Sequence, residues 1–267
     1  MQVALRTRLV FFGAIVVGTN ILPANISNLG LINANVNVTA TSGSVSDVGI
    51  AAGYVFNGVI TNVYTTGTLT VTGVGTNNNF YIGGLLGFYE SSSADVFTTA
   101  NVYSTASINV SNYAIDVGGL IGRLIGNNQY ALPTTLVNSY TNGKVTCGTN
   151  CTSIGGLVGA VTAGSGSGSV DISTSYSTSS VNTGTNGSEV GGLVADSSGG
   201  TSISQSYSAG SVTTGSGSND VGGFVANNGS SITQSFWDTA TSGQSVGVAS
   251  GFAATSLTGG CVRRANG

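Results

Sequence analysis

Histidine is absent from this chain, and charged side chains make up only 6% of its 267 residues. The absence of histidine removes the usual general base, the Ser-His-Asp arrangement and the commonest metal ligand. A zinc peptidase site of the His-Glu-x-x-His type is excluded for the same reason. We therefore expect a chain that is not an enzyme, with no catalytic residues and no cofactor.

Basic residues are scarce in particular. There are six in all, and four of them lie near the two ends, at Arg6, Arg8, Arg263 and Arg264. Nucleic-acid binding requires Lys and Arg gathered on one face, where they neutralise phosphates. Because the net charge is also −3, we expect no nucleic-acid partner.

Proline is almost missing too, with 2 residues against 43 glycines. Central β-strands exclude proline, and tight turns between short strands favour glycine. Hydrophobic residues still make up 40% of the chain, so we expect a packed core and not a disordered glycine-serine segment. No helical periodicity is visible, and no change of composition separates two domains.

One apolar phrase recurs five times at a nearly constant interval. Its first glycines, at 83, 118, 155, 191 and 222, are separated by 35, 37, 36 and 31 residues. The structural positions that follow them are Gly84, Leu85, Gly87, Gly119, Leu120, Gly122, Gly156, Leu157, Gly159, Gly192, Leu193, Gly223 and Phe224. In the last two copies Ala195 and Ala226 replace the final glycine. A fixed period in this range predicts a solenoid, in which each unit buries its apolar face against its neighbours.

A second phrase keeps in phase with the first and ends in an aromatic residue. These aromatics are Tyr64, Tyr103, Tyr140, Tyr176, Tyr207 and Phe236. Two residues before each of them stands Asn, Gln or, once, Thr. Stacked coils place equivalent residues about 4.8 Å apart, so we expect a column of amides that pass hydrogen bonds between coils, beside a column of aromatic rings. The strands that follow alternate polar and apolar residues, which indicates one packed face and one outward face.

These patterns predict an all-β chain folded as a right-handed parallel β-helix, or β-solenoid, of about seven coils with 31–40 residues each. The handedness follows from the general preference of parallel β crossovers. We expect residues 1–8 to be an N-terminal flank, residues 9–237 the solenoid, and residues 238–267 a closing segment that is cut short.

Residues 1–18 support two interpretations. Arg6 and Arg8 followed by an apolar run have the shape of the start of a signal peptide. In the other interpretation, which we favour, Phe11-Phe12-Gly13 is the repeated step of a first coil. The run is too short to span a bilayer in either case, so we expect no transmembrane segment.

The stretches Gly84-Leu85-Leu86-Gly87, Gly119-Leu120-Ile121-Gly122 and Gly156-Leu157-Val158-Gly159 resemble the GLUG motif. That motif occurs in secreted bacterial adhesins similar to filamentous haemagglutinin and in immunoglobulin A-specific metallopeptidases. The segment from Ser235 to Gln244 also resembles the one that often closes such arrays. The resemblance implies an extracellular or cell-surface location and a structural or adhesive role.

In that role a polar surface of Thr, Asn, Ser and Tyr would make multivalent contacts with surface glycans or other extracellular surfaces. Two alternatives are a carbohydrate-active β-helix enzyme and an accessory region of a secreted peptidase. An ice-binding solenoid is a lesser alternative.

The acidic residues look scattered, but four of them directly precede the repeated Val-Gly step, at Asp47, Asp116, Glu189 and Asp220. We interpret them as residues that start turns. Glu189 and Asp220 lie on adjacent coils and are also weak candidates for calcium ligands. Otherwise we expect no metal site.

Two cysteines lie four residues apart, Cys147 and Cys151, in a turn-rich loop. A small disulfide is possible there, and so is a buried free thiol, because Cys147 occupies an inward position of its strand. Cys261 has no evident partner. Neither end of the predicted rod has a convincing cap, so we expect end-to-end self-association.

Overall fold

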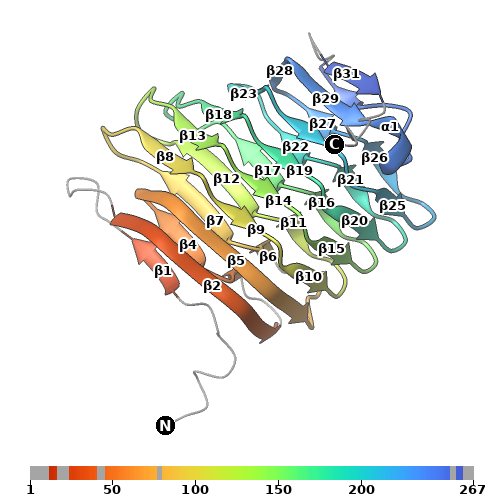
Figure 1. Cartoon of the computed structure of the whole chain (residues 1–267), viewed down its shortest axis with the longest axis horizontal. Coiled ribbons are helices and arrows are strands. Elements are labelled where there is room, and N and C mark those ends of the chain that lie inside the picture. Colours follow the sequence, from red (N-terminus) through yellow and green to blue (C-terminus); the bar gives the residue numbers. More distant parts are fainter. Residues whose placement is uncertain (1–11, 17–23, 41–45, 77–79, 253–256, 261–267) are drawn as a thin grey trace, which may run out of the picture.

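The computed structural model describes residues 12–16, 24–40, 46–76, 80–252 and 257–260, which are coloured in Figure 1. Its strands pair in parallel and wind into about six complete turns, with a partial turn at each end. The predicted parallel β-helix is therefore confirmed. The count falls below seven because the described part of the opening turn has strands in only two of the three walls.

Three parallel sheets form the walls of the rod. The six-stranded wall contains β3 (Ser46–Gly49), β6 (Phe80–Gly83), β11 (Ile115–Gly118), β16 (Thr152–Gly155), β21 (Ser188–Gly191) and β26 (Asn219–Gly222). The eight-stranded wall contains β1 (Phe12–Val16), β4 (Ala52–Phe56), β7 (Leu86–Ser91), β12 (Ile121–Asn127), β17 (Val158–Thr162), β22 (Val194–Ser197), β27 (Val225–Asn228) and β30 (Val248–Gly251).

The third and longest wall is hereafter called the long wall. Its first two strands are single and long, and later turns break the same path into short pieces. Its strands are β2 (Ala24–Thr39), β5 (Gly58–Thr72), β8 (Phe97–Ala100), β9 (Tyr103–Ser104), β10 (Ser107–Val110), β13 (Thr134–Val137), β14 (Tyr140–Thr141), β15 (Lys144–Cys147), β18 (Val170–Ser173), β19 (Tyr176–Ser177), β20 (Ser180–Thr183), β23 (Thr201–Ser204), β24 (Tyr207–Ser208), β25 (Val212–Thr214), β28 (Ser231–Thr233), β29 (Ser235–Asp238) and β31 (Leu257–Gly260).

Strand β1 lies in the register that the first-coil interpretation expects. Phe12 pairs with Ala52, and Ala52 pairs with Leu86. Phe12 thus takes the same place as the third residue of Gly-Leu-x-Gly in the next turns. The signal-peptide interpretation of these residues stays a prediction.

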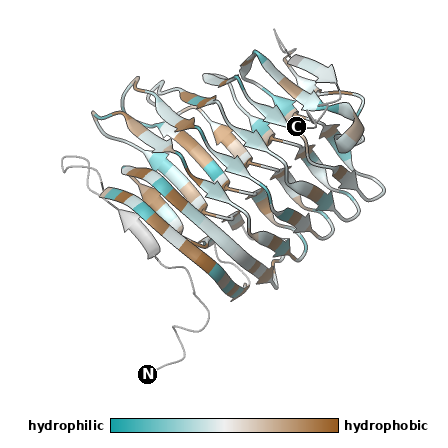
Figure 2. Ribbon diagram, viewed as in Figure 1, coloured by the Kyte–Doolittle hydropathy of each residue, from teal (hydrophilic) through white to brown (hydrophobic). Residues whose placement is uncertain are grey.

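Inward side chains form two hydrophobic clusters inside the rod. The first lies between the eight-stranded wall and the N-terminal part of each long-wall strand, and it contains the repeated Leu85, Leu120, Leu157, Leu193 and Phe224, each 0% exposed. The second lies between the six-stranded wall and the C-terminal part of the long wall, and it contains Val36, Leu69, Ile108, Val145, Val181 and Val212. The alternation of apolar and polar segments that produces this burial is visible along β2 in Figure 2.

A row of buried hydroxyl groups lies between the two clusters. The residue after each of the five tyrosines of the aromatic column is Ser or Thr, and Thr141 Oγ1 donates to the carbonyl oxygen of Gly156 at 2.8 Å. Thr65 and Ser208 donate in the same way to Gly84 and Gly223. A Cβ added at Gly156 would collide with the hydroxyl of Ser177. The carbonyl of Gly156 is thus satisfied by the hydroxyl before it in the chain, while the missing side chain leaves room for the hydroxyl of the next turn.

Buried serines replace backbone donors and acceptors where the long wall bends. Ser139, Ser175, Ser206 and Ser235 precede the aromatic residues, and the first three of these donate their own N–H to the hydroxyl of the next serine at 3.2 Å. Each hydroxyl in turn donates to the carbonyl oxygen two residues earlier. Such buried polar groups need partners, so the repeated Ser-Tyr phrase has a structural reason.

At the C-terminal end of the rod a non-repeating segment packs against the last complete turn, where the sequence showed no convincing cap. Trp237 takes the place of the buried hydroxyl residue, lies over Gly223 and donates from its indole nitrogen to Gln244 O at 3.2 Å. Asp238 then caps the short helix α1 (Thr239–Ser242), and Gln244 Nε2 donates to Val212 O at 3.0 Å. This segment satisfies groups that a further turn would otherwise bond. Within the described ranges, no helix is long and apolar enough to cross a membrane.

Candidate functional site

The outer face of the long wall is a regular and nearly uncharged surface. In-register rows cross the turns, such as Asn37, Thr70, Asn109, Thr146, Asn182 and Thr213. A neighbouring row contains Asn35, Thr68, Ser107, Lys144, Ser180 and Ser211, where β25 begins one residue after Ser211. Only Lys144 and Asp171 are charged among the described outward residues of this wall. Each row therefore repeats a neutral hydroxyl or amide at about the strand spacing of 4.8 Å.

The aromatic column stacks across six successive turns of the long wall, from Tyr64 on β5 to Phe236 on β29. From Tyr64 to Phe236, successive ring centroids are 4.7–5.1 Å apart and the planes lie within 7° of parallel. Between Tyr64 and Phe236 each ring face is thus covered by the next ring, and the ring edges and the tyrosine hydroxyls point outward. Burial raises the pKa of Tyr140, Tyr176 and Tyr207, with adjacent tyrosines adding to the first two. The column presents neutral hydroxyl groups.

The predicted amide column is present, and its residues also share an unusual backbone conformation. Asn62 Nδ2 donates to Asn28 Oδ1 at 3.0 Å, and Asn101 Nδ2 donates to Asn62 Oδ1 at 3.2 Å. Every member of the column has a positive φ, from 46° to 56°, including Gln205 and Gln234. Asn tolerates the left-handed region better than most residues, so the column marks a bend that the sequence pattern did not show.

Thr174 is the β-branched exception in this column, with φ 46°. A β-branched residue in the left-handed region is strained by roughly 1–3 kcal/mol. Thr174→Asn should therefore raise the free energy of unfolding by about 1 kcal/mol, while keeping a donor near Asn138 Oδ1, which Thr174 now contacts at 2.5 Å. The reverse change, Asn138→Thr, should lower it by a similar amount. Chemical denaturation measures both, and a loss of stability in Thr174→Asn would contradict the strain.

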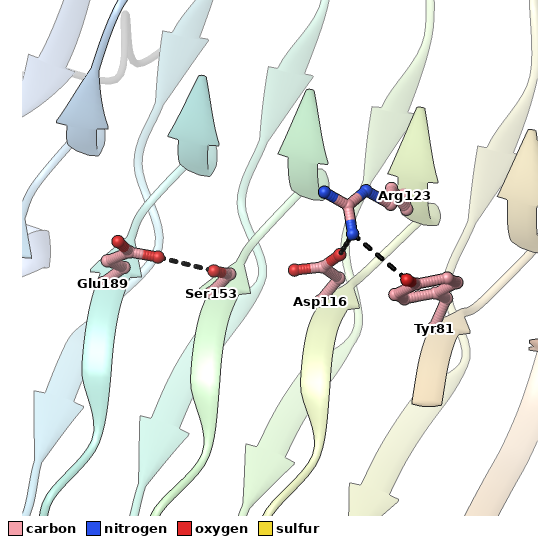
Figure 3. Close-up of polar contacts among 5 residues, drawn as sticks. All are labelled: Tyr81, Asp116, Arg123, Ser153 and Glu189. Atoms are coloured by element: carbon pink, nitrogen blue, oxygen red, sulfur yellow. Dashed lines mark hydrogen bonds and ion pairs between the residues drawn. The ribbon is translucent and has the colours of Figure 1, made fainter. Parts of the chain in front are cut away.

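A second outward surface lies where the six-stranded and eight-stranded walls meet. We call its two facing lines of residues the corner rows. One row contains Asp47, Tyr81, Asp116, Ser153, Glu189 and Asp220, and the other contains Tyr54, Phe88, Arg123, Ala160, Asp196 and Asn227. Figure 3 shows four members of the first row side by side on successive strands, with Arg123 reaching across from the other wall.

The glycines of the repeated phrase allow the two walls to meet so closely. A Cβ added at Gly118 would collide with the carbonyl oxygen of Ile121, and the equivalent clash recurs at the first glycine of every complete turn. A Cβ at Gly159 would lie 2.6 Å from the backbone of Asp116 on the preceding turn. The corner is therefore backbone against backbone, and the first side chains that fit outside it are those of the corner rows.

The sequence analysis interpreted the corner acids as residues that start turns, and this interpretation is wrong. Asp116, Ser153, Glu189 and Asp220 lie inside strands with φ between 49° and 56°. The residues on either side of them keep the strand pairing, since Ile115 pairs with Thr152 and Val117 pairs with Ile154. Each is a left-handed kink in a strand, like a β-bulge, and it turns the side chain toward the opposite wall.

Arg123 joins the two rows. Its Nη1 lies 3.2 Å from Asp116 Oδ2 and donates to Tyr81 Oη at 3.2 Å, with the guanidinium 5.2 Å from the centre of the Tyr81 ring (Figure 3). On the next turns Ser153 Oγ donates to Glu189 Oε2 at 2.6 Å. Asp116 is only 3% exposed. The centre of the corner is thus a salt bridge with a cation–π contact.

Burial raises the pKa of the corner carboxyl groups. The pKa of Asp116 rises to about 7 through burial, and Arg123 opposes the rise while Asp196 and Glu189 add to it. Burial and the nearby Glu90 raise the pKa of Asp47 to about 6. The pKa of Asp196 is also raised, first by burial and then by Glu189. Keeping these carboxyl groups ionised in the folded chain therefore lowers the free energy of unfolding.

This arrangement predicts that the protein loses stability as the pH rises from about 4 to about 7. Over that range the unfolded chain has released protons that folded Asp47 and Asp116 still hold, so the slope of unfolding free energy against pH is negative. Asp47→Asn should remove its share of the slope between about pH 4 and 6, and Asp116→Asn its share between about pH 4 and 7. Thermal melts across the range measure this, and a stability that rises steadily over it would contradict the assignment.

Glu189 and Asp220 are adjacent in their row, but each already has a partner. Glu189 accepts from Ser153, and Asp220 accepts from Asn219 Nδ2 at 2.8 Å. No group of three His, Cys, Asp or Glu in the described part of the chain is placed to hold a metal ion. We therefore assign no ion to the two predicted calcium candidates.

Sequence reasoning identified one corner row but not the other. Six of the nine acids of the chain lie at the corner, because Glu90 and Asp196 on the eight-stranded wall join Asp47, Asp116, Glu189 and Asp220. Tyr54 Oη donates to Glu90 Oε1 at 2.5 Å. The only sequence signal was the constant distance between each acid and the outward residue seven positions later, as from Asp116 to Arg123.

Cys147 and Cys151 form a disulfide whose Cα atoms are 6.3 Å apart. Both cysteines are also buried in the second cluster, at 2% and 0% exposure. The inward position and the disulfide, which were alternatives in the sequence, are thus compatible. Cys261 lies outside the described residues.

Comparisons with models of protein families, with curated proteins and with solved structures find no match for this chain. The resemblance to the GLUG motif consequently stays a prediction, and the functional argument depends on the surfaces described above.

Proposed function

We propose that this chain is a non-catalytic β-solenoid segment of a secreted or cell-surface protein, which binds surface glycans or other extracellular surfaces through the outer face of its long wall. The observation that carries the proposal is the repetition on that face. Asn, Thr and Ser side chains recur in register on every turn, with only two charged residues among them.

Such a face suits neutral ligands that are rich in hydroxyl groups. Its amides and hydroxyls both donate and accept hydrogen bonds, and the tyrosine hydroxyls extend the same chemistry along the aromatic column. The ring faces are covered by one another, so stacking of a sugar on an open ring face is not part of the mechanism. Each contact is weak, and affinity grows when several turns bind one extended ligand.

A binding role is favoured over hydrolysis by the state of the corner carboxylates. Carboxylate enzymes that act on polysaccharides need two acids that reach the scissile bond. Asp116 is buried beneath Arg123, and Glu189 accepts a hydrogen bond from Ser153. These acids are engaged with the fold and not with an open cleft.

Export is supported by the disulfide and by the resemblance to secreted adhesins. Disulfides persist in oxidising compartments and are rare in the cytosol, and Cys147 and Cys151 are paired. The near absence of charge on the long wall also fits a surface that contacts neutral ligands, because nucleic-acid binding requires clustered basic residues.

The test is a glycan array with the chain displayed in many copies, together with a polysaccharide-depolymerisation assay and an ice-recrystallisation assay. Binding without depolymerisation is expected. Thr213→Lys, at an exposed position of the long wall, should weaken it, whereas Thr162→Lys on the eight-stranded wall should not. Cleavage of a polysaccharide, inhibition of ice growth without glycan binding, or equal effects of the two lysines would overturn the proposal.

A further inference from the structure

The amide column of the long wall is exposed along its whole length. Its members are Asn28, Asn62, Asn101, Asn138, Thr174, Gln205 and Gln234, and the side chain of each one is exposed. The partly exposed tyrosine column lies two residues further along each turn, with its hydroxyls outward. Both columns follow the rod axis, because their members lie on successive turns.

The asparagines of this column keep hydrogen-bonding capacity for a ligand. An asparagine side chain has two N–H donors and an oxygen with two lone pairs. Asn62 donates one N–H to Asn28 and accepts one bond from Asn101. Within the described chain, one donor and one lone pair of its amide are therefore left for a ligand. The bonds between neighbouring amides also fix the direction of these groups before a ligand binds.

The spacing of the turns selects among extended ligands. Successive rings of the aromatic column are 4.7–5.1 Å apart. An extended peptide advances about 3.3 Å per residue, and its alternate side chains are about 6.6 Å apart, so neither repeat stays in step with the turns. A β-1,4-linked pyranose advances an extended polysaccharide by slightly more than one turn. One sugar can therefore lie over each of several successive turns.

Charge selects further among polysaccharides. Lys144 and Asp171 are the two charged residues among the described outward residues of the long wall, and the whole chain has a net charge of −3. A chain of uronic acids would bring a negative charge with each sugar and find a single lysine on this wall. Its approach would also be opposed by the net charge of the protein. A neutral polysaccharide needs only the hydrogen bonds that the two columns offer.

We propose that the long wall binds a neutral β-1,4-linked polysaccharide whose chain lies parallel to the rod axis, with one sugar on each turn over the tyrosine and amide columns. This inference rests on the function proposed above and adds the class of glycan and its direction. A second chain can lie beside the first, over the parallel row that contains Asn182 and Thr213. The weak contacts of successive turns then act together on one ligand.

Titration calorimetry with oligosaccharides of increasing length, from disaccharide to octasaccharide, tests the alignment. The probes are β-1,4-linked series of glucose, mannose and N-acetylglucosamine. At least one series should bind more tightly with each added sugar up to about the hexasaccharide, because the aromatic column spans six turns, and should gain little beyond it. The α-1,4-linked glucose series, whose chain curls, should show no such rise.

Tyr140→Phe removes one hydroxyl from the middle of the column and keeps a stacked ring, as Phe236 does at the end of the column. It should weaken binding of the hexasaccharide about threefold or more. It should change binding of the disaccharide little, because a disaccharide can bind on other turns. Tyr130→Phe is the matched control, since Tyr130 is 40% exposed on the loop before β13 and outside the column. It should change neither affinity.

Three results would overturn this inference and leave the proposed function standing. They are glycan binding that does not strengthen beyond the disaccharide in any β-1,4-linked series, tighter binding of α-linked or uronic-acid chains, and a Tyr140→Phe effect that is absent or equal at both lengths. Binding of no glycan, in these titrations or on the array, would overturn both proposals.

Discussion

Replacing Leu157 with aspartate is expected to unfold most of the rod, with a loss of about 4 kcal/mol or more in the free energy of unfolding. Leu157 is 0% exposed and lies at the middle of the stacked leucine column. Its backbone bonds to both neighbouring turns, through Leu120 N and Leu193 O. An aspartate there would have no partner for its charge. The two adjoining turns could not move away to admit water, because the backbone of residue 157 is hydrogen-bonded to both of them.

The matched control is Asn182→Asp, which places the same side chain on the same turn but on the outward face of β20. It should change stability by less than about 0.5 kcal/mol. Urea denaturation followed by circular dichroism compares the two variants. Similar losses from both would mean that the inward and outward faces are assigned wrongly.

Replacing Gly118 with alanine should cost about 3 kcal/mol or more, although it adds a single methyl group. The new Cβ would collide with the carbonyl oxygen of Ile121, and the next turn prevents that backbone from moving aside. Gly159→Ala should cost less, because Ala195 already occupies the equivalent position on a later turn.

Gly199→Ala is the control for this change. A Cβ at Gly199 would have 4.0 Å to its nearest neighbour, and φ there is not in the left-handed region. Its melting temperature should match that of the unaltered chain. If Gly118→Ala melted at the same temperature as Gly199→Ala, the close contact of the two walls at the corner would be in doubt.

The periodic sequence predicted the stacking well because it records which residues lie above one another. Leu85, Leu120 and Leu157 share a phase, and the same phase places each of them directly before an equivalent strand of the eight-stranded wall. The roles of single glycines were harder to infer. The GLUG resemblance drew attention to the second and last glycines of each phrase. The first glycine, such as Gly118, has the tightest contact with its surroundings. The second, such as Gly156, lies against a hydroxyl group of the long wall.

The candidate surfaces were predictable only within a wall. The amide and tyrosine columns of the long wall lie along single in-register rows, so their spacing in the sequence was enough. The pairing of Asp116 with Arg123 depends on how two walls face each other at the corner. The period of the sequence carries no information about the angle between two walls. It also does not show the left-handed backbone conformation that turns the Asp116 side chain toward Arg123. The bonds of Trp237 and Gln244 at the C-terminal end were missed because these two residues occur once and have no repeat to compare with.

Deleting one complete turn tests the stacked-coil architecture most directly. Removal of residues 155–190 joins Ile154 to Gly191, which is the residue that pairs with Gly155 one turn later. Because neighbouring turns are equivalent, the shortened chain should fold, keep its β-type circular dichroism and melt in one transition. Removal of residues 155–172 from the same starting point takes out about half a turn, and it should leave a chain that does not fold. If the half-turn deletion folded as well as the full-turn deletion, or if neither folded, the stacked register of this β-solenoid would be contradicted.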